Sequence, residues 1–453
     1  MSTLVVGAGV AGLAAARALV QAGEEVVVLE AKDRIGGRTH TSYDFADVPV
    51  ELGAEFIHGD RAATWELIRE LNLETLHWRK TDDSMVRLED GAWLTVAQAR
   101  ARYPDFEQTR AWTLPDEEPL PFETWQDYLR RIGFSREQLR YVARSFANAC
   151  GESPRLLNAR TMVELLRDNG SESGWGDYRL LGGYGELTEG LAQGLDVHLR
   201  TPVQEVRWSA SGNVEVRTAS GRRYSADNAV ISVPLGVLQG HLTFSPALPA
   251  FKRAALAGLR MGPVIKLIYK FSEPIIAEDI MAIYSRLNPP MWWSPSFGHE
   301  TAQHVWTAFV SGDRASELLE MGEEGALEYA LTSLREELGR PDLLAEHAQL
   351  VNWCADPFVR GGYSYVLPGH EGARGRLATP TPPLYWAGEA TEPEHRAATV
   401  HGALLSGRRA AAELLSYEGE VVAPIAAEVE VPLERRMKKS AQPVSEEKRD
   451  LEA

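Results

Sequence analysis

The sequence predicts an α/β protein that opens with a doubly wound parallel sheet and continues into a region of mixed helices and strands. Residues 4–6 form a short apolar segment, followed by a glycine-rich turn, an alanine-rich helix and a second apolar segment at 25–30. This order of strand, tight turn, helix and strand is typical of doubly wound sheets. The stretch from 75 to 173 instead has amphipathic patterns, which predict a mostly helical region.

Four further strands are predicted along the chain. Segments at 201–208 and 214–218 are joined through a turn at 211–213. Short apolar segments at 229–233 and 384–387 have the length and composition of buried strands.

One more strand and a last helix complete the prediction. The strand at 264–271 places Lys266 on the same face as two apolar side chains, so we expect this lysine to be partly buried. A helix is predicted at 400–417, where apolar residues recur at helical spacing. From residue 418 onward the chain is polar and charged, which predicts a solvated or disordered tail.

Length, composition and charge exclude several classes of protein. The 453 residues allow two or three domains, and 44% hydrophobic with 25% charged residues exclude a disordered or fibrous chain. Asp plus Glu number 64 against 47 for Lys plus Arg, a formal charge of −17. Nucleic-acid binding is therefore not expected, because phosphate contacts need clustered basic charge. The acidity favours cationic partners, although its commoner role is to keep a protein soluble.

Cysteine content and hydropathy bear on the cellular compartment. The two cysteines, Cys150 and Cys354, predict neither a disulfide framework nor a metal site, which fits a reducing cytoplasm. No segment holds the roughly 18 apolar residues that a membrane helix needs, so we expect no membrane span. The first strand begins by residue 4, which leaves no room for a secretory signal. The sequence therefore predicts a cytoplasmic protein.

A glycine motif follows the first predicted strand. Gly7 permits the tight turn, Gly9 lets backbone N–H groups approach a pyrophosphate, and Gly12 lets the helix pack closely on the strand. Glu30 lies 23 residues after Gly7, where a carboxylate can accept hydrogen bonds from ribose hydroxyls. The motif follows a strand and opens a helix, so it predicts a dinucleotide site at a helix N-terminus.

A second glycine pair favours FAD over NAD. Residues 34–38 (RIGGR) follow the ribose carboxylate directly, and their arginines can neutralise a diphosphate. Two phosphate-facing loops around one diphosphate suit a cofactor that is held permanently, as FAD is. NAD, by contrast, leaves the enzyme in each turnover.

Six further sequence blocks occur in order along the chain. They are ELGAEFIHG at 51–59, GGYGEL at 182–187, VPLGVL at 233–238, GGYSY at 361–365, WAGEAT at 386–391 and ATVHGALLSG at 398–407. With the two glycine motifs, they resemble the flavin-containing amine oxidases, the family of monoamine oxidases, polyamine oxidases and flavin-dependent histone demethylases. The resemblance extends to about Tyr417, and the last block is most similar to the polyamine oxidase and histone demethylase branch.

The resemblance implies the amine oxidase fold, in which a Rossmann-type FAD-binding domain is interleaved with an α+β substrate-binding domain. We expect the FAD-binding domain at 1–75, 181–235 and 379–417. The substrate domain is expected to have a helical segment at 76–180 and a sheet segment at 236–378, and the charged tail is 418–453.

The resemblance also implies a set of residues that bind FAD. Position 362, where monoamine oxidases have the cysteine that attaches FAD, is a glycine and cannot form a thioether, so we expect noncovalent FAD. The implied cofactor-binding residues are Gly7, Gly9, Val10, Ala11, Gly12, Glu30, Ala31, Lys32, Gly37, Arg38, Leu52, Gly53, Ala54, Glu55, Val203, Trp353, Gly388, Glu389, Thr399 and Val400.

Five residues match catalytic positions of the family. Lys266 matches the lysine held near flavin N5 through a water, and Trp353 matches a tryptophan near the flavin. Tyr363 matches one aromatic wall of the amine site, whereas Thr399 stands where monoamine oxidases have the second tyrosine, which favours a longer or bulkier amine. His58 matches a position close to the substrate nitrogens. Each of these residues also has a plain structural interpretation. Lys266 would then be an edge lysine, Trp353 and Tyr363 core aromatic residues, and His58 an ordinary hydrogen-bonded histidine.

The implied reaction is oxidation of a C–H bond next to an amine nitrogen by hydride transfer to FAD, then imine hydrolysis and reduction of O2 to H2O2. A polyamine or other primary or secondary amine is the expected substrate, and the protein is expected to be a monomer or homodimer. One alternative is an L-amino-acid oxidase, with Arg286 or Arg360 binding the substrate carboxylate. A flavin-holding protein without turnover and a carotenoid-type desaturase are the others.

Overall fold

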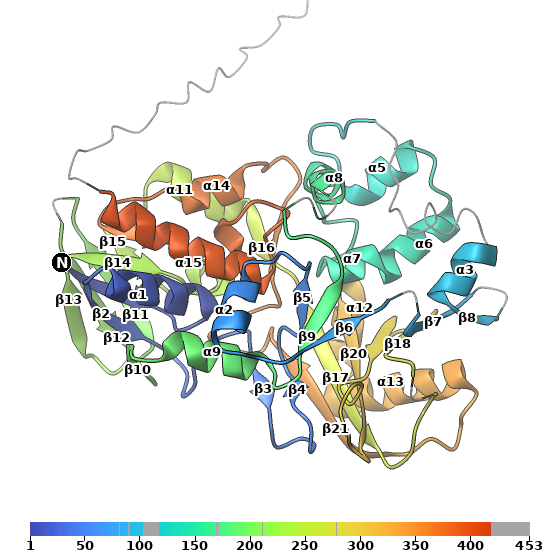
Figure 1. Cartoon of the computed structure of the whole chain (residues 1–453). Helices are drawn as coiled ribbons and strands as arrows, with labels where there is room; N and C mark the ends of the chain where they lie inside the picture. Colours follow the sequence, from blue (N-terminus) through green and yellow to red (C-terminus); the bar gives the residue numbers. More distant parts are fainter. Residues whose placement is uncertain are drawn as a thin grey trace, which may run out of the picture. The chain divides into compact units, whose positions relative to one another are not determined.

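A computed structural model gives the fold of the chain (Figure 1). It describes residues 1–80, 82–88, 91–102, 117–168, 170, 172–210, 212–277 and 279–417. The predicted tail at 418–453 and Ser211 of the predicted turn lie outside the described residues. Within those residues, no helix combines the length and the apolar character needed to cross a bilayer.

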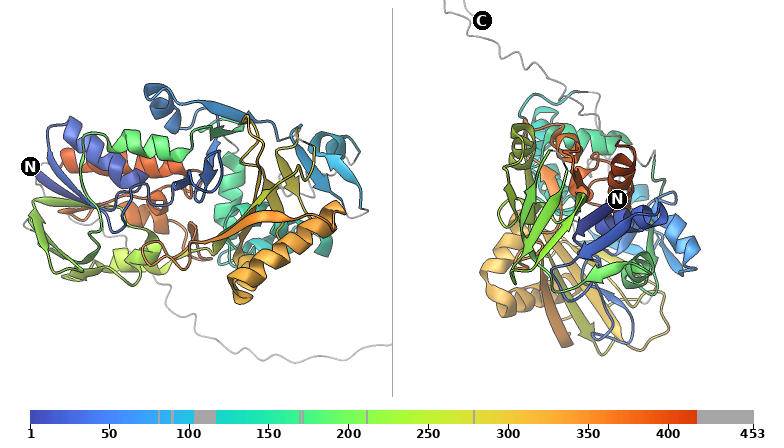
Figure 2. Two further views of the ribbon diagram at one scale, coloured as in Figure 1. Left: turned by 90° about the horizontal axis from the view of Figure 1, so that it is seen from below. Right: turned by 90° about the vertical axis from the view of Figure 1, so that its left-hand side faces the viewer.

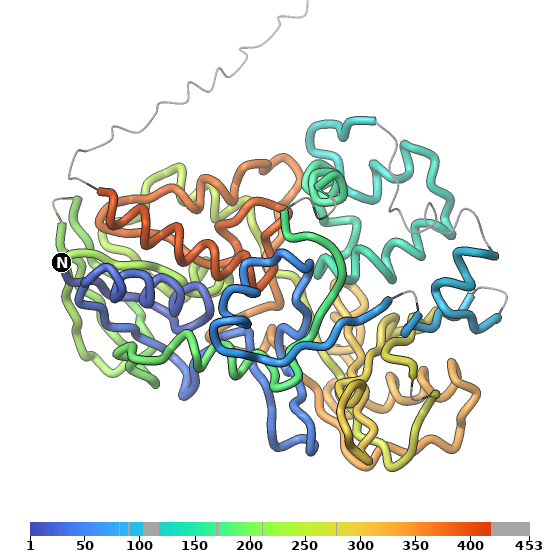
Figure 3. The backbone as a smooth tube through the Cα atoms, viewed as in Figure 1, coloured from blue at the N-terminus to red at the C-terminus, as the bar shows by residue number. Residues whose placement is uncertain are grey.

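A five-stranded parallel sheet with the order β10-β2-β1-β14-β23 forms the first layer, which confirms the predicted doubly wound sheet. Its β1 and β2 are valine-rich and largely buried, as expected for parallel strands covered on both faces. Stretches from the beginning, middle and end of the chain meet in it (Figure 3). The strands are β1 (Ser2–Val6), β2 (Glu25–Leu29), β10 (Asp196–His198), β14 (Asn228–Ile231) and β23 (Leu384–Trp386).

Three helices lie against this sheet. The alanine-rich α1 (Val10–Gln21) packs between α9 (Tyr184–Ala192) and α15 (Val400–Leu415) (Figure 1). Gly9 is the N-cap of α1 and offers no side chain to the first turn, and Gly23 follows its end with φ +88°. Both ends of α1 therefore follow from local sequence.

A four-stranded sheet with the order β13-β12-β11-β15 shares an apolar core with the parallel sheet. Val6 and Ile231 of the parallel strands pack in one cluster with Val206 and Val216. Short helices join the same core. The elements are β11 (Val203–Trp208), β12 (Val214–Thr218), β13 (Arg223–Ala226), β15 (Thr243–Ser245), α10 (Leu235–Leu238), α11 (Ala250–Ala257) and α14 (Ala373–Ala378).

The second large layer is a seven-stranded sheet with the order β21-β17-β20-β19-β18-β7-β8. Helices α12 (Gly312–Glu320) and α13 (Gly322–Leu338) pack on it through one apolar cluster (Figure 2). Its strands are β7 (Ser84–Arg87), β8 (Trp93–Thr95), β17 (Val264–Phe271), β18 (Ala282–Tyr284), β19 (Met291–Trp293), β20 (His304–Ser311) and β21 (Ala345–Asn352).

The stretch 76–180 is less helical than the sequence indicated. Its β7 and β8 pair at the edge of the seven-stranded sheet, and β6 pairs in a three-stranded sheet with the order β5-β9-β6. Strands of three or four residues are too short to show a two-residue period, so the helical pattern around them dominated the prediction. The elements are α3 (Val96–Arg102), α5 (Trp125–Arg131), α6 (Arg136–Arg144), α7 (Phe146–Ala149), α8 (Ala159–Asp168), β6 (Thr75–Trp78) and β9 (Asp177–Leu180).

Short elements connect these layers around the site described below. Strand β22 pairs with β16, and η1 follows β23 directly. These connecting elements are β3 (Thr41–Ser42), β4 (Val50–Glu51), β5 (Phe56–His58), α2 (Thr64–Glu70), β16 (Leu259–Met261), β22 (Ser364–Val366) and the 3-10 helix η1 (Glu389–Thr391).

The contact between α1 and α15 depends on Gly407. A Cβ added at this glycine would lie 2.1 Å from the carbonyl oxygen of Ala11, so no side chain fits there without moving one helix. The close approach holds the first turn of α1 against α15.

We expect Gly407→Ala to lower the free energy of unfolding by about 1–3 kcal/mol, because the added methyl overpacks a helix–helix contact. Gly375→Ala is the matched control, since Gly375 also lies in a helix and a Cβ added there would have no neighbouring atom within 4 Å. That control should be neutral or stabilising by up to about 1 kcal/mol. Denaturant unfolding measures both, and equal stability of the two variants would contradict the packing argument.

Candidate active site

A cavity of about 920 Å³ lies between the carboxyl ends of the parallel strands and the seven-stranded sheet. Gly9 and Glu30 line it from the parallel sheet, and Lys266 and Phe309 line it from the other sheet. Ligands of doubly wound sheets bind outside the carboxyl ends of the strands. The cavity is therefore the candidate active site.

The glycine motif shapes one end of the cavity. Gly7 has φ +106°, and a Cβ at Gly12 would lie 1.9 Å from the carbonyl oxygen of Gly7, so neither position tolerates a side chain. Gly9 has no atom within 4 Å of its Cβ position, which leaves open space beside the N-terminus of α1. Backbone N–H groups and the helix dipole at this end favour an anionic group.

Glu30 is held in the cavity wall by two backbone donors. One carboxylate oxygen accepts from the N–H of Ala8 at 2.7 Å, and the other accepts from the N–H of Lys32 at 2.8 Å. Burial raises the pKa of Glu30 above its ordinary value, and these two hydrogen bonds oppose that effect. A carboxylate has about four lone-pair sites, so it can still accept from a hydroxyl group.

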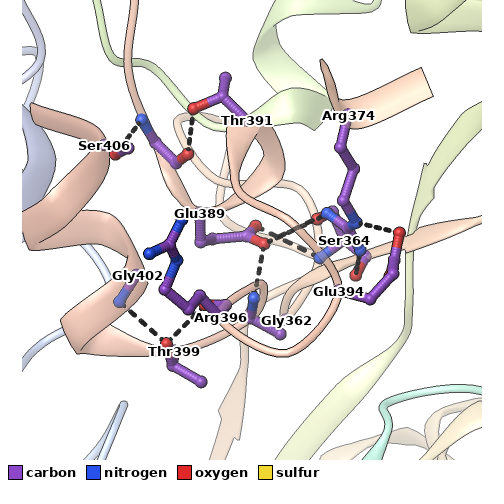
Figure 4. Close-up of polar contacts among 12 residues, drawn as sticks. Gly362, Ser364, Arg374, Glu389, Thr391, Glu394, Arg396, Thr399, Gly402 and Ser406 are labelled. Carbon is purple, nitrogen blue, oxygen red and sulfur yellow. Dashed lines mark hydrogen bonds and ion pairs between the residues drawn. The ribbon is translucent and has the colours of Figure 1, made fainter. Parts of the chain in front are cut away.

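Glu389 is a centre of hydrogen bonding in the cavity wall (Figure 4). Its carboxylate accepts from Arg38 Nη1 at 2.9 Å, from the Ser364 hydroxyl at 2.6 Å and from the N–H of Ala398 at 3.1 Å. The same Arg38 nitrogen donates to the carbonyl oxygen of Gly362 at 2.8 Å. Burial opposes ionisation, but the arginines beside Glu389 hold its pKa below the ordinary value.

Arg374 is the second cation of this network. It donates to the Ser364 hydroxyl at 2.6 Å and to Glu394 at 3.0 Å, and its Nη1 lies 3.9 Å from Glu389 (Figure 4). Thr399 is the N-cap of α15, where its hydroxyl accepts from the N–H of Gly402 at 2.9 Å. The network thus fixes both the cavity wall and the start of the last helix.

Lys266 is buried on β17 and its ammonium is fully engaged. Its Nζ donates to the backbone carbonyl of Glu51 at 2.8 Å and to the Glu55 carboxylate at 3.0 Å, and it lies 5.2 Å from the ring centre of Trp293. Arg179 lies 3.6 Å from the other Glu55 oxygen. The Glu55 carboxylate is thus shared between two buried cations, which compensates for its burial.

Glu51 lies beside Lys266, but its carboxyl group is hydrogen-bonded to neutral groups. Its carboxylate accepts from the N–H of Tyr184 at 2.6 Å and from the hydroxyl of Thr41 at 3.0 Å. Burial raises the pKa of Glu51 to about 7. Burial thus favours the protonated form of Glu51 more than in an exposed carboxyl group.

Tyr363 is positioned by the segment that follows α7. Its hydroxyl donates to the carbonyl oxygen of Ala149 at 2.5 Å, and a Cβ at Gly151 would lie 2.4 Å from its ring. Burial raises the pKa of Tyr363, so its side chain is neutral. The neighbouring Cys150 also lines the cavity, and burial raises its thiol pKa to about 12.

Two other predicted residues, Trp353 and His58, flank the cavity. Trp353 donates its indole N–H to the carbonyl oxygen of Leu52 at 2.9 Å, and Lys32 lies 5.4 Å from its ring centre. His58 Nδ1 lies 2.5 Å from the carboxylate of Asp177, so this histidine is oriented by a buried acid. Both side chains line the cavity.

The structure brings nearly all predicted site residues to this one cavity. Leu52 and Gly12 do not line it; Leu52 contributes its carbonyl to Trp353, and Gly12 packs against Gly7. The predicted residues that line the cavity from the N-terminal third are Gly7, Gly9, Val10, Ala11, Glu30 and Ala31. Further lining residues are Lys32, Gly37, Arg38, Gly53, Ala54, Glu55 and His58. Those from later stretches are Val203, Lys266, Trp353, Tyr363, Gly388, Glu389, Thr399 and Val400.

Sequence reasoning missed several residues that shape the site. Ser364 lies inside the sequence block at 361–365, but the sequence did not predict its hydrogen bond to Glu389. Arg374, Asp177 and Gly151 lie outside every sequence block, so only their tertiary contacts identify them.

The glycine end of the cavity fits a dinucleotide. Open space beside Gly9, the N-terminus of α1, the carboxylate of Glu30 and the guanidinium of Arg38 provide sites for a diphosphate and a ribose. Within the described residues, no group of three or more His, Cys, Asp or Glu side chains is arranged to hold a metal ion.

Comparisons with known proteins agree with this geometry. A family model described as flavin-containing amine oxidoreductase matches residues 10–415. Polyamine oxidase 3 of Oryza sativa subsp. japonica is 31% identical over 91% of this chain and 88% of its own length. Lysine-specific histone demethylase 1B of Mus musculus is 28% identical over 92% of this chain, which spans only 53% of that protein.

A solved structure of putrescine oxidase bound to putrescine has the same fold. It superposes with a TM-score of 0.77 at 24% identity, over 92% of this chain and 100% of that chain. The family match spans nearly all of the described residues and includes every layer of the fold. The chain therefore belongs to the flavin-containing amine oxidoreductases, and it is an enzyme whose cofactor is FAD.

Proposed function

We propose that the protein is an oxidase of polyamines or other primary and secondary amines, with O2 as the electron acceptor. The observation that supports this most is the buried Lys266 ammonium, which shares the cavity with the neutral ring of Tyr363. When bound, FAD supplies the acceptor for the hydride that leaves the carbon next to the amine nitrogen.

The cavity residues have separable roles in this proposal. Lys266 provides a fixed positive charge inside a low-dielectric wall, which stabilises negative charge that develops during oxygen reduction. Tyr363 excludes water and favours the neutral amine, which is the form that can lose hydride. Arg38 and the N-terminus of α1 bind the diphosphate, and Glu30 binds the ribose.

The arginine contacts favour amines over L-amino acids. Arg286 lies beside Glu337, and Arg360 lines a separate small pocket with Gly236. Arg38 and Arg374 do line the cavity, but Arg38 lies on the second glycine loop, where the diphosphate is expected, and Arg374 is buried and paired with Glu394. Among the described residues, the cavity therefore presents no arginine that is positioned for a substrate carboxylate.

Location and assembly remain predictions. Cys150 and Cys354 are both free thiols, which supports a reducing compartment such as the cytoplasm. We expect a monomer or homodimer that binds an amine and O2.

The substrate class is tested by a panel of spermine, spermidine, putrescine, a monoamine and several L-amino acids. We expect amine-dependent release of H2O2 and anaerobic bleaching of the flavin by the amines, with no bleaching by the amino acids. Bleaching by L-amino acids alone would overturn the proposal. Photoreduction without bleaching by any compound would indicate a flavin-holding protein without turnover.

We expect Lys266→Met to retain FAD and to lower kcat by about 100-fold, because it removes the fixed cation of the cavity. The variant also leaves Glu55 without the nearer of its two cations, which is costly in a buried position. Lys266→Arg is the control, since it keeps a cation beside Glu55 and should lose much less of the rate. Stopped-flow reoxidation measures the loss, and near-normal rates in Lys266→Met would contradict the assigned role.

We expect the flavin to be released by acid or heat denaturation and to pass into the filtrate. Position 362 is glycine, and a Cβ added there would lie 2.3 Å from a side-chain methyl group of Val264, so a cysteine would clash with that side chain. The thiol of Cys150 lines the cavity, but burial raises its pKa to about 12, so it is protonated and a weak nucleophile. Yellow colour that stays with the precipitated protein would show a covalent link.

A further inference from the structure

We propose that Asp177, Trp78 and His58 form a binding subsite for the remote ammonium group of a diamine or polyamine, and that the side chain of Lys80 occupies this subsite in the free enzyme. The inference rests on the proposed amine oxidase function and names the part of the cavity that selects substrates with a second nitrogen. The site is built from the three-stranded sheet β5-β9-β6.

The three side chains form a row across this sheet. Asp177 on the central strand β9 lies directly opposite His58 on β5 and directly opposite Trp78 on β6. Residues that lie opposite each other on neighbouring strands project to the same face of the sheet. All three line the cavity, so the row faces its interior.

Lys80 shows which chemical group this row binds. Its ammonium pairs with Asp177 Oδ2 and lies 4.9 Å from the ring centre of Trp78. A carboxylate beside an aromatic face is the combination that binds an alkylammonium ion through charge and cation–π attraction. The lysine side chain is itself a primary alkylammonium, the same group that ends a diamine.

The acid and its lysine differ in their exposure to solvent. The side chain of Lys80 is 41% exposed, whereas that of Asp177 is 9% exposed. Burial alone would raise the pKa of Asp177, but Lys80 and His58 hold it well below its usual range, so the carboxylate stays charged. Lys80 can turn into solvent, because its own side chain is already partly exposed. The buried carboxylate then needs another cation.

An aromatic wall joins this subsite to Lys266. The Lys266 ammonium lies 5.2 Å from the ring centre of Trp293, which lies 5.2 Å from that of Phe56. Phe56 in turn lies 5.1 Å from the ring centre of Trp78. These residues all line the cavity. The wall suits the methylene chain that separates the reacting nitrogen from the remote ammonium.

Other carboxylates of the cavity are less available to a substrate. Glu55, Glu389 and Glu394 are paired with Lys266, Arg38 and Arg374, whose side chains are 5%, 24% and 5% exposed. Releasing any of these partners would strand a buried cation inside the protein. Lys80 is the most exposed of these four cations, so among these four carboxylates Asp177 exchanges its partner most readily.

The test compares butane-1,4-diamine with butan-1-amine as substrates of the holoenzyme. Lys80→Met removes the competing ammonium and should raise the ratio of kcat/KM for the diamine over the monoamine about two- to fivefold, the range expected for an exposed ion pair. Lys80→Arg keeps a competing cation and should leave the ratio near that of the wild type. Asp177→Asn should lower the ratio about tenfold or more, since it removes the charged acceptor.

Calorimetric binding of both amines to the anaerobically reduced enzyme separates this inference from the proposed function. If neither amine reduces the flavin, the amine oxidase proposal fails, and tighter diamine binding in Lys80→Met would still support the subsite. The subsite proposal is wrong if the amines reduce the flavin but the diamine-to-monoamine ratio of kcat/KM is unchanged in both Lys80→Met and Asp177→Asn. Circular dichroism checks that each variant is folded. If Asp177→Asn does not fold, the diamine-to-monoamine ratio of Lys80→Met alone tests the subsite.

Discussion

The buried carboxylate of Glu389 is the interaction on which the arrangement of the site depends. It binds Arg38 from the second glycine loop, Ser364 from strand β22 and the backbone N–H of Ala398 just before helix α15. A buried carboxylate is strongly unfavourable unless it is paired and hydrogen-bonded. The phosphate-facing loop, the strand that follows Tyr363 and helix α15 are therefore held together by this one group.

A second group of charges gives the other half of the cavity its character. Lys266 and Arg179 share the Glu55 carboxylate, so a fixed cation is kept inside an apolar wall without a free counterion. Several acidic groups of the cavity have a partner of the opposite charge from the same chain. The formal charge of −17 is thus not the direct source of attraction at the reacting centre.

Local motifs were predictable, and contacts between distant segments were not. The tight turn at Gly7, the start of α1 and the strand β17 lie close to where the sequence placed them, because each depends on a few adjacent residues. The strands β6, β7, β8 and β9 within 75–180 were missed, because strands of three or four residues are too short to show a two-residue period. The sequence also did not predict that the hydroxyl of Thr399 caps helix α15.

The sequence alone determined the fold class, the dinucleotide motif and the family resemblance, because these are properties of contiguous segments. Tertiary structure decided the charge environment of each catalytic candidate. The Arg38–Glu389 pair joins residues 351 positions apart, and the Lys266–Glu55 pair joins residues 211 positions apart. Asp177 meets His58 and Trp78 only because β9 lies between β5 and β6. Burial and ion pairing are set by which segments meet in space, and no local pattern encodes that meeting.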